Sequence, residues 1–543
     1  TREDLQADST LTIQSGGSLV NTNLNNIARG YIAAGNEIDG ATIVVESNAS
    51  IEGKSNAIMG RETNNLTITN SGTISASTSK AINLRDAQNT TITNKKGATI
   101  TANTNAIVQE AAGTEDAENV TISNSGTISS VENRSIYFYE DATNTTLTNN
   151  SSGLIYNTAD DPTVQLGTSS TLTNSGTIEN RNSPSNSSIT LVGNNNTITL
   201  KDGGKVVGTI AAGSTTGNTL KIQHGVGQSY FYKTSGNDMT LQDLDGNQIV
   251  KGSAGSVGQG GNENIDELLG YKSLNIRKSL DKFVKSEGFK NKETEWQGIQ
   301  ATSLERKEHT KNLALGYEFI SLGVNIIRPS ENENVIASFE YSEQDFQKDH
   351  NIRRYNLLFG LHYNETEINK LKNNSFILAG ATLNEGERKI LTNTTSSGTL
   401  NITDTYESFE IHAGKRFKNK SLIPNIGTNL SYSYTPDHSE SKYYSWDDKH
   451  VANFSLDLSD EFSIEREKSK SKFGIGWILD YRTLITGSKT DYSVNGTKAT
   501  YKQDDDLTKE MTLSVSINYE KKFYKFGKIL ISIDGMQTTQ DVS

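Results

Sequence analysis

Cysteine is absent from the 543-residue chain, and only five prolines and three tryptophans occur. Without cysteine, the chain can form neither disulfides nor thiolate metal sites. Hydrophobic residues make up 33% of the sequence, which is less than a globular domain usually contains. An uninterrupted apolar run of about 18 residues, as a transmembrane helix requires, is also missing. A chain of this kind either crosses a membrane as a β-barrel or is not an integral membrane protein.

Basic residues are outnumbered by acidic ones. The 52 basic and 64 acidic residues give a net charge of −12 and a pI near 5.3. Residues 1–260 contain 15 basic and 23 acidic residues, a net charge of −8, and the remaining 37 and 41 give −4. Nucleic acids bind to concentrated basic surfaces. We therefore expect no nucleic acid partner for either half.

The composition changes near residue 260. All three Trp, 15 of the 21 Tyr and 14 of the 16 Phe follow this point. The Gly- and Ser-rich stretch 252–263 is typical of a flexible linker. The sequence therefore predicts two domains of different chemistry.

The first domain is built from a repeat. Thr67-Ile68-Thr69-Asn70-Ser71-Gly72-Thr73-Ile74 recurs with small changes, and its Asn returns as Asn94, Asn124, Asn149 and Asn174, at steps of 24, 30, 25 and 25 residues. A fixed period of this size indicates stacked structural units rather than a disordered low-complexity tract. β-Branched Thr and Ile favour strands. The repeat predicts a right-handed parallel β-helix over residues 1–213, with Ile, Leu and Val pointing inward. We expect the repeated Asn residues to adopt a left-handed turn and to stack as a ladder.

The repeat fades after residue 213 and a denser apolar set follows. This set comprises Leu220, Ile222, Tyr230, Phe231, Tyr232, Met239, Leu241, Leu244 and Ile249. The end of a solenoid exposes unpaired strand edges and needs a cap. Residues 214–251 are therefore predicted to be a capping segment that resembles an autochaperone.

Residues 264–290 are predicted to contain one amphipathic helix. Its polar face carries the basic residues Lys272, Arg277, Lys278, Lys282 and Lys285. The helix precedes a long run of strands, which favours a helix threaded through a pore. An ordinary surface helix remains the alternative.

Residues 291–543 alternate strictly between apolar and polar side chains over strands of about ten residues, the pattern of transmembrane barrels. Long strands, aromatic residues at strand ends and polar loops of unequal length favour a barrel over a soluble sheet. We count about eleven strands from 295 to 536. Closed bacterial barrels have even numbers of strands, so a twelfth is expected beyond the sequence or has been missed. The polar side chains expected in the lumen, facing the helix, are Glu340, His362, Glu410, His412, Arg416 and Asp480.

A β-helical domain, a capping segment, a helix and about 280 residues of alternating strands together resemble the classical monomeric autotransporters of type V secretion. The resemblance covers essentially the whole chain. It implies an all-β protein with a 12-stranded transmembrane barrel, a helix inside the pore and a passenger on the bacterial surface. It also implies as partners outer-membrane lipid, lipopolysaccharide and the barrel-assembly machinery. Some members cleave themselves at an Asn–Asn pair in the helix. Here Asn262-Glu263-Asn264 has no such pair, so we expect the passenger to remain attached.

Catalytic, cofactor and metal sites are not expected. The segment before residue 260 has one histidine, His224, and no Gly-Asp-Ser or Gly-x-Ser-x-Gly motif. Asp243-Leu244-Asp245-Gly246-Asn247 lacks the closing Glu of a calcium loop, and Asp504-Asp505-Asp506 is predicted to lie in a solvated loop. The leading hypothesis is a surface scaffold or adhesin whose ligand is an unknown glycan or protein. The alternatives are a channel, a phage or partner receptor, and a passenger enzyme with an unfamiliar site.

Overall fold

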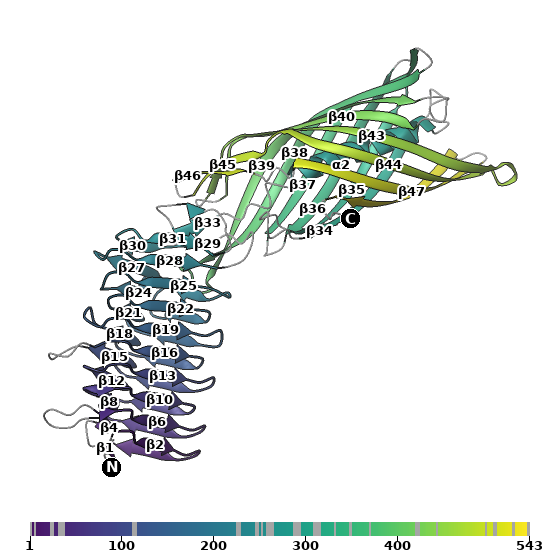
Figure 1. Cartoon of the computed structure of the whole chain (residues 1–543). Coiled ribbons are helices and arrows are strands. Elements are labelled where there is room, and N and C mark those ends of the chain that lie inside the picture. Colours follow the sequence, from purple (N-terminus) through teal and green to yellow (C-terminus); the bar gives the residue numbers. More distant parts are fainter. Residues whose placement is uncertain are drawn as a thin grey trace. The chain divides into compact units, whose positions relative to one another are not determined.

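The computed structural model describes the chain except residues 1–2, 5–6, 22–25, 31–37, 111–116, 224–229, 245–248, 251–253, 257–264, 286–294, 308–315, 331–332, 347–349, 369–370, 419–423, 441–443, 495–496, 503–507, 524–526 and 540–543. The chain divides into two compact units (Figure 1). The first comprises Thr1–Val257 together with Ile390–Leu400, and the second comprises Gly258–Lys389 with Asn401–Ser543. Most of the predicted linker 252–263 lies outside the described residues, as does Asn262-Glu263-Asn264.

Three parallel sheets run along the first unit, and each of the first eight coils contributes one strand to each sheet (Figure 1). Sheet A contains β1 (Glu3–Asp4), β4 (Asn26–Gly30), β8 (Asn56–Gly60), β12 (Ile82–Arg85), β15 (Ile107–Glu110), β18 (Ile136–Phe138), β21 (Val164–Leu166), β24 (Ser187–Leu191), β27 (Thr209–Gly213) and β30 (Thr234–Gly236). Sheet B contains β2 (Thr10–Ile13), β6 (Thr42–Val45), β10 (Thr67–Asn70), β13 (Thr91–Asn94), β16 (Thr121–Asn124), β19 (Thr146–Asn149), β22 (Thr171–Asn174), β25 (Thr197–Leu200), β28 (Thr219–Ile222) and β31 (Thr240–Asp243). Sheet C contains β3 (Ser18–Asn21), β7 (Ser50–Gly53), β11 (Thr73–Ala76), β14 (Thr99–Ala102), β17 (Thr127–Ser130), β20 (Leu154–Asn157), β23 (Thr177–Asn180) and β26 (Lys205–Val207). A short pair, β5 (Ile38–Asp39) with β9 (Thr63–Asn64), lies beside them. The predicted parallel β-helix is confirmed.

The core of the β-helix is a stack of aliphatic columns. Ile68, Ile92 and Ile122 are hydrogen-bonded neighbours in register, and each is completely buried. Thr residues on either side of each Ile face outward, because successive side chains of a strand point to opposite faces. The repeated Thr-Ile-Thr-Asn therefore places one Ile and one Asn per coil inside the β-helix.

The inward Asn residues form the predicted ladder. The side-chain Nδ2 of Asn70 donates to Oδ1 of Asn94 at 2.9 Å, and the steps from Asn94 to Asn124, to Asn149 and to Asn174 are each 2.8 Å. All five residues are at most 1% exposed. Their predicted left-handed conformation is wrong, because they are the last residues of extended strands. Left-handed backbone instead occurs one turn earlier in the coil, with φ of 54° at Asn65, 50° at Asn89 and 55° at Asn119.

On sheet A, the side chain of Gln109 interrupts a column of apolar residues. Gln109 points inward between Leu84 of the preceding coil and Phe138 of the next, and it is fully buried. Among the described residues, neither its amide nitrogen nor its amide oxygen has a hydrogen-bond partner. A buried amide without partners destabilises the folded state. This coil is therefore a weak point of the β-helix.

The C-terminal end of the β-helix is covered by strands that leave the coil pattern. β29 (Tyr230–Tyr232) pairs antiparallel with β33 (Ala254–Ser256), which also pairs with β32 (Ile249–Val250). Tyr230 and Tyr232 are at most 2% exposed and belong to the same hydrophobic core as the coils. Burial raises the pKa of the Tyr232 phenol.

The segment Ile390–Leu400 also belongs to this end of the β-helix. Its Leu391 and Thr392 pair in parallel with Tyr230 and Phe231. The buried Asn393 side chain accepts from the backbone N–H of Lys233 at 2.6 Å and donates to the carbonyl oxygen of Lys233 at 2.8 Å. The amide of Asn393 thereby hydrogen-bonds the N–H and the carbonyl oxygen of Lys233, which an additional paired strand would otherwise satisfy.

The second unit is a curled antiparallel sheet of long strands (Figure 1). Its path runs through β34 (Trp296–Arg306), β35 (Tyr317–Arg328), β36 (Glu333–Phe346), β37 (His350–Ile368), β38 (Leu371–Thr392), β39 (Thr399–Lys418), β40 (Asn425–Thr435), β43 (Lys449–Arg466), β44 (Ser471–Thr486), β47 (Lys509–Phe523) and β48 (Gly527–Thr538). This path holds eleven of the twelve predicted strands. A smaller sheet joins β41 (His438–Glu440), β42 (Tyr444–Trp446), β45 (Lys489–Val494) and β46 (Thr497–Lys502), and the 3₁₀ turn Glu467–Ser469 links β43 to β44.

The long strands expose apolar side chains and bury polar ones. On β43, Leu456 and Leu458 are 43% and 38% exposed, whereas Asp457 between them is 1% exposed. On β47, Met511 and Leu513 are 44% and 47% exposed around a buried Thr512. The predicted alternation is confirmed, with the apolar residues on the outside. Among the described residues, α2 (Ile265–Lys285) and the other helical segments are not apolar and long enough to span a membrane.

Gln109→Leu is expected to raise the free energy of unfolding of the β-helix by about 1 to 3 kcal/mol, because it removes an unpaired buried amide. Leucine already occupies the equivalent inward position at Leu84. Urea-dependent protease resistance of the full chain measures the change. Gln242→Leu, the same substitution at an outward position of β31, serves as the control. A lower midpoint for Gln109→Leu would contradict the assignment.

Asn393→Ala is expected to expose the backbone of Lys233 to solvent, because both hydrogen bonds of the Asn393 amide are lost. Hydrogen exchange of the full chain should become faster in the segment around Lys233, with the loss of one or two hydrogen bonds worth about 1 kcal/mol each. Thr395→Ala, in the same segment, should leave this exchange unchanged. Equal acceleration by both substitutions would show that Asn393 has no particular role.

Candidate functional site

The helix α2 lies inside the curl of the long sheet. Its side chains contact residues of strands that range from β34, at one edge of the sheet, to β48 at the other. Most of these contacts are polar, and one end of the helix also joins a small apolar cluster with Phe283 and Leu280. The helix therefore fills the polar interior of the curled sheet, and the contacts that hold it there form the candidate site.

Arg277 is the centre of the ion pairs. It pairs with Asp457 of β43, and its Nη2 lies 4.0 Å from Oδ1 of Asp480 on β44. The side chains of Arg277 and Asp457 are 4% and 0% exposed. A charge buried this deeply is tolerated only with a partner, and removing one partner costs about 3 to 5 kcal/mol. The pairing fixes both the rotation and the depth of the helix.

Lys272 anchors the helix one turn and a half earlier. Its Nζ lies 2.7 Å from Oε2 of Glu410 on β39. Glu410 also accepts hydrogen bonds from Asn356 at 3.2 Å and from Thr382 at 2.8 Å, and His412 lies 3.3 Å from it. Glu410 thus collects donors from three strands and the helix.

Acidic groups near the N-terminal end of the helix complete a second set of contacts. Glu267 accepts from Arg306 at 3.2 Å and from the Tyr317 hydroxyl at 3.0 Å. Tyr271 donates to Glu510 at 2.6 Å, and Arg482 pairs with the same carboxylate. Negative charge near a helix N-terminus is favoured by the helix dipole.

Gly270 allows this part of the helix to lie close to the sheet. A Cβ at this position would come within 2.5 Å of Cδ of Arg482. Any larger side chain would push Arg482 away from Glu510. The absence of a side chain at Gly270 is thus required by the packing.

The remaining basic residues of the helix have polar partners in the sheet. Lys278 donates to Ser514 Oγ at 2.8 Å, and Lys282 lies 3.8 Å from Asp534. The side chain of Lys285 lies outside the described residues. Arg416 pairs with Asp281 of the helix, so this lumen residue holds an acidic group of the helix and not its basic face.

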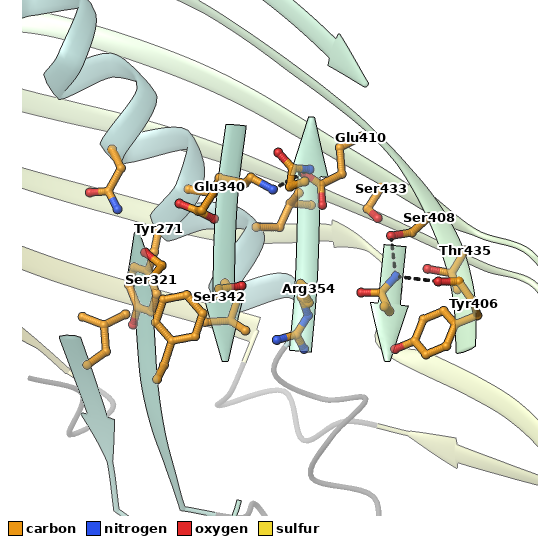
Figure 2. A pocket seen from close by; sticks show the side chains of 18 residues that line it. Tyr271, Ser321, Glu340, Ser342, Arg354, Tyr406, Ser408, Glu410, Ser433 and Thr435 are labelled. Atoms are coloured by element: carbon orange, nitrogen blue, oxygen red, sulfur yellow. Dashed lines mark hydrogen bonds and ion pairs between the residues drawn. The ribbon is translucent and has the colours of Figure 1, made fainter. Parts of the chain in front are cut away.

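Glu340 and His362 occupy two further positions in the interior. Glu340 lines a cavity of about 50 Å³ beside Tyr271 and Arg354 (Figure 2). His362 is 1% exposed, its Nδ1 lies 3.0 Å from Asn334 Nδ2, and its ring packs edge-on against Phe283 at 6.1 Å. His362 therefore contacts the apolar end of the helix.

A second cavity lies along the C-terminal half of the helix. Its volume is about 270 Å³, and both acidic and basic side chains line it, among them Lys278, Asp281, Arg416, Glu461 and Asp534. The cavity contains space for several water molecules.

The sequence identified the basic residues of the helix and two of their carboxylate partners, Glu410 and Asp480. The other two carboxylate partners, Asp457 and Asp534, were not predicted. Neither were Glu267 and Glu510, which pair with Arg306 and Arg482 of the sheet. Asp457 could have been predicted from the sequence, because it is an acidic residue between Leu456 and Leu458, at a position of the alternating strand that faces the polar side. Glu267 gives no such signal, because acidic residues are common in the first turn of any helix.

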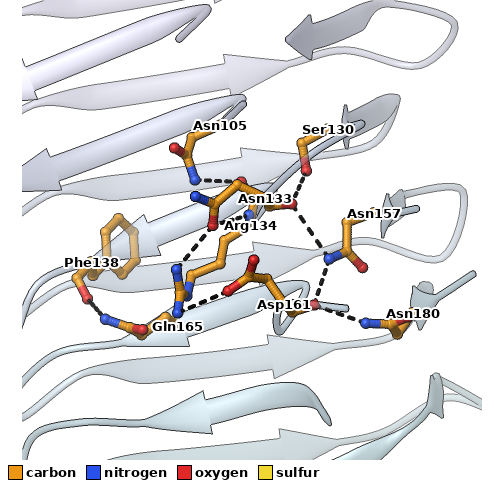
Figure 3. A network of polar contacts seen from close by, with 9 residues as sticks. All are labelled: Asn105, Ser130, Asn133, Arg134, Phe138, Asn157, Asp161, Gln165 and Asn180. Atoms are coloured by element: carbon orange, nitrogen blue, oxygen red, sulfur yellow. Dashed lines mark hydrogen bonds and ion pairs between the residues drawn. The ribbon is translucent and has the colours of Figure 1, made fainter. Parts of the chain in front are cut away.

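The β-helix has a separate polar cluster at the corner between sheets C and A (Figure 3). Asn157 Nδ2 donates to the carbonyl of Asp161 at 2.6 Å, and Asn180 Nδ2 donates to the same carbonyl at 2.8 Å. The Arg134 guanidinium lies 3.2 Å from the Asp161 carboxylate and hydrogen-bonds Asn133 at 2.9 Å. Asn157 and Asn180 are the last residues of successive sheet C strands, and this second Asn column was not predicted from the sequence.

Tyrosines flank this corner. Arg134 lies over the ring of Tyr137 at 4.6 Å, and Arg181 over the ring of Tyr156 at 3.6 Å. Tyr139 stacks on Tyr137 at 4.4 Å, and burial, with Tyr137 and Glu110 nearby, raises the pKa of its phenol. Each charged group in this cluster already has a partner within the β-helix, so the geometry indicates a structural brace.

Groups of three or more His, Asp or Glu side chains suited to a metal ion do not occur in the described part of the chain. Asp245, Gly246 and Asn247 of the segment considered as a calcium loop lie outside the described residues. His224 and the run Asp504-Asp505-Asp506 lie outside them as well.

Comparison with known proteins finds matches among solved structures. Neither a protein-family model nor a curated protein matches the chain. Among solved structures, the chain is similar to one titled as the β domain of the Bordetella autotransporter BrkA, at 8% sequence identity. The alignment covers 46% of this chain and 93% of that chain, with a TM-score of 0.28. A similarity this low does not assign a function, so the function has to be argued from the contacts between the helix α2 and the long sheet of this chain.

Reversing the charge of the helix should open the interior of the sheet. In Arg277→Glu/Lys278→Glu/Lys282→Glu, the acidic Asp457, Asp480 and Asp534 would repel the helix. We expect conductance of the full chain in planar lipid bilayers to rise above that of the unaltered chain. Lys468→Glu/Lys470→Glu, at the exposed turn between β43 and β44, is the matched control. Unchanged conductance in the triple variant would contradict a plugging role.

Proposed function

We propose that the chain is an autotransporter of the bacterial outer membrane. The curled sheet acts as the membrane anchor and export domain, and the β-helix is the passenger displayed on the cell surface. The observation that carries the proposal is the charged helix held within a sheet whose outer side chains are apolar.

The exposed apolar side chains support a lipid-facing surface. Phe339, Leu357, Phe359, Ile411 and Ile517 are each between 44% and 56% exposed, and they belong to four different strands. Contiguous apolar surface larger than a few hundred Å² is rare on proteins in water and marks a contact with a partner or a membrane. A bilayer surrounds a curled sheet and can cover apolar side chains on all of its strands, whereas a single protein partner would cover only one side.

The contacts of the helix support an export mechanism that ends with a closed pore. The interior of the sheet is polar, so an extended chain can pass through it in contact with water and polar side chains. When export ends, Arg277 and Lys272 reach Asp457 and Glu410, and these buried pairs hold the last segment in place. The energy for outward movement comes from coil-by-coil folding of the β-helix, which prevents its return.

The passenger is proposed to act without catalysis, as a scaffold or adhesin. Its coils carry uniform columns of Ile, Asn and Thr, and its charged side chains pair with one another at the corner around Arg134. We propose as partners outer-membrane lipid, lipopolysaccharide, the barrel-assembly machinery during insertion, and a glycan or protein ligand at the surface.

A passive channel is the second candidate. The cavity of about 270 Å³ beside the helix favours it, because water in this space would allow small ions to pass if it connected both sides of the sheet. Steady open-pore conductance of the unaltered chain would favour the channel, and a quiet bilayer recording favours the plugged transporter.

Protease treatment of intact cells that produce the full chain tests the proposal. We expect a protease to remove the residues before about 260 and to leave a membrane-embedded fragment, because a sheet with lipid outside and a helix inside is protected. The fragment should resist extraction at alkaline pH and should migrate differently on gels before and after heating. A periplasmic marker protein that stays intact is the control for membrane integrity. A chain released by alkaline extraction would contradict the proposal.

A further inference from the structure

Sheet B carries one continuous row of threonines. The first residue of all ten strands is Thr, and each pairs in register with the Thr of the next coil, from Thr10 to Thr240. These ten residues are Thr10, Thr42, Thr67, Thr91, Thr121, Thr146, Thr171, Thr197, Thr219 and Thr240. Figure 1 shows these strands stacked one above another along the β-helix.

A second outward column on the same sheet extends the row to a surface. The third residue is Thr in six of the ten strands, and in the other four it is Val44, Ser123, Lys221 and Gln242. From β2 to β25, neither column contains a charged residue. We call these two columns the threonine face.

 The seven hydroxyl side chains of the second column are those of Thr12, Thr69, Thr93, Ser123, Thr148, Thr173 and Thr199.

Neither strand propensity nor solubility explains this uniformity, because both would act equally on all three sheets. On sheet C, the third residues of the strands are Val20, Glu52, Ser75, Thr101, Ser129, Tyr156, Glu179 and Val207. On sheet A, the corresponding column is largely covered, with Asn83, Val108 and Gln165 at most 6% exposed, so it offers no comparable open surface. The first residues of the sheet C strands are also mostly Ser or Thr, but Leu154 and Lys205 interrupt them. Sheet B differs in that its first column is Thr in all ten strands and its third column is uncharged from β2 to β25, although these side chains do not enter the core. This comparison indicates that the surface of sheet B is used for contact.

The period of the threonine face restricts what can bind along its whole length. Neighbouring strands are about 4.8 Å apart, so a partner whose repeat differed by about a tenth would lose register by half a step after roughly five strands. A second copy of the chain has the same period by construction. A threonine hydroxyl is both a donor and an acceptor, so two such faces are complementary to each other.

The charges also favour a second copy. Residues 1–260 have a net charge of −8, so two copies repel each other over most of their surfaces. From β2 to β25 the threonine face is uncharged, and Lys221 of β28 is the one charged residue in its two columns. Exposed charges further away than about 8 Å are largely screened at physiological salt. Two copies can therefore approach each other through sheet B with the least repulsion.

The size of the face predicts weak pairing. Strands of four residues and a stack of ten strands give roughly 13 Å by 48 Å, or about 600 Å² on each copy, which is close to the lower limit for a specific interface. A single pair of copies would separate readily. Many pairs between two cell surfaces would hold together, because linked weak contacts gain greatly in avidity.

We infer that the threonine face of sheet B binds the threonine face of a second copy on a neighbouring cell, so that the passenger joins like cells together. The inference rests on the proposed surface display. It identifies the surface ligand as another copy of this chain.

Charge substitutions on the face test the inference. In Thr67→Lys/Thr91→Lys/Thr121→Lys, like charges would meet across the paired faces, and clumping should fall to the level of cells without the chain. The matched control is Thr73→Lys/Thr99→Lys/Thr127→Lys, which alters the first residue of the sheet C strand in the same three coils and should clump like the unaltered chain. Lysine is compatible with this strand position, because Lys205 occupies it in β26.

Mixing two variants separates pairing between copies from binding to other molecules. Cells with Thr67→Glu/Thr91→Glu/Thr121→Glu should not clump alone, but should clump with cells that carry the Lys variant. Clumping of producing cells with cells that lack the chain would overturn the inference, as would equal loss in the sheet C control. Dispersed cells that display the unaltered passenger to protease would overturn it as well.

Beads coated with the purified full chain provide an arm that does not require export. If the chain does not reach the cell surface, the proposed function is wrong, but the bead experiment still shows whether two copies of the chain bind each other. We expect beads with the unaltered chain to clump, beads with the Lys variant to stay dispersed, and a mixture of Lys and Glu beads to clump. Dispersed beads with the unaltered chain would contradict the inference.

Discussion

The whole structure depends on one constraint, which is that a strand satisfies its backbone hydrogen bonds only through its neighbours and must turn successive side chains to opposite faces. In the β-helix, the coil above and the coil below provide these bonds, and the alternation divides each Thr-Ile-Thr-Asn strand into an inner and an outer half. The inner half then repeats every coil. A column of identical side chains is the natural result, and it explains why Asn70 meets Asn94 at hydrogen-bonding distance.

The same constraint is used in the opposite sense in the long sheet. There the inner side chains are polar and the outer ones apolar, as Leu456, Asp457 and Leu458 show. A polar interior cannot be filled by a hydrophobic core, so it requires water or a polar segment. The helix α2 meets this requirement with Lys272 and Arg277, which reach carboxylates on β39 and β43. Its apolar end, with Phe283, packs near Trp296 and His362.

The sequence predicts those features that depend on periods along the chain. The coil period, the inward Ile columns and the strand alternation are local patterns, so a β-helix, a helix and a long antiparallel sheet could be derived from them. The Asn ladder was predictable because one residue type recurs at one place in each coil. The backbone conformation of the ladder residues was not predictable, because each coil has two Asn residues that could adopt the left-handed conformation. The structure shows that Asn65, and not Asn70, is left-handed.

Contacts between distant parts of the chain were not predictable. Arg277 and Asp457 are 180 residues apart, and any of several lumen acids could have served as the partner. Arg416 was grouped with the lumen residues that face the basic side of the helix, yet it pairs with Asp281, because which helix side chain it meets depends on the rotation of α2. Asn393 could not be identified either, since its role depends on the placement of Ile390–Leu400 with the β-helix.

In a repeat protein, residues that folding restricts can be distinguished from residues that folding leaves free to vary, because the same position recurs in every coil. The inward positions are restricted by packing, so their uniformity needs no functional explanation. Outward positions are free to vary, and on sheet C they do, with Glu52, Tyr156 and Glu179 in one column. Uniformity at outward positions of sheet B is therefore the more informative pattern. It supports the proposed use of this face outside the fold, because the third residues of the sheet C strands are equally free to vary and do differ.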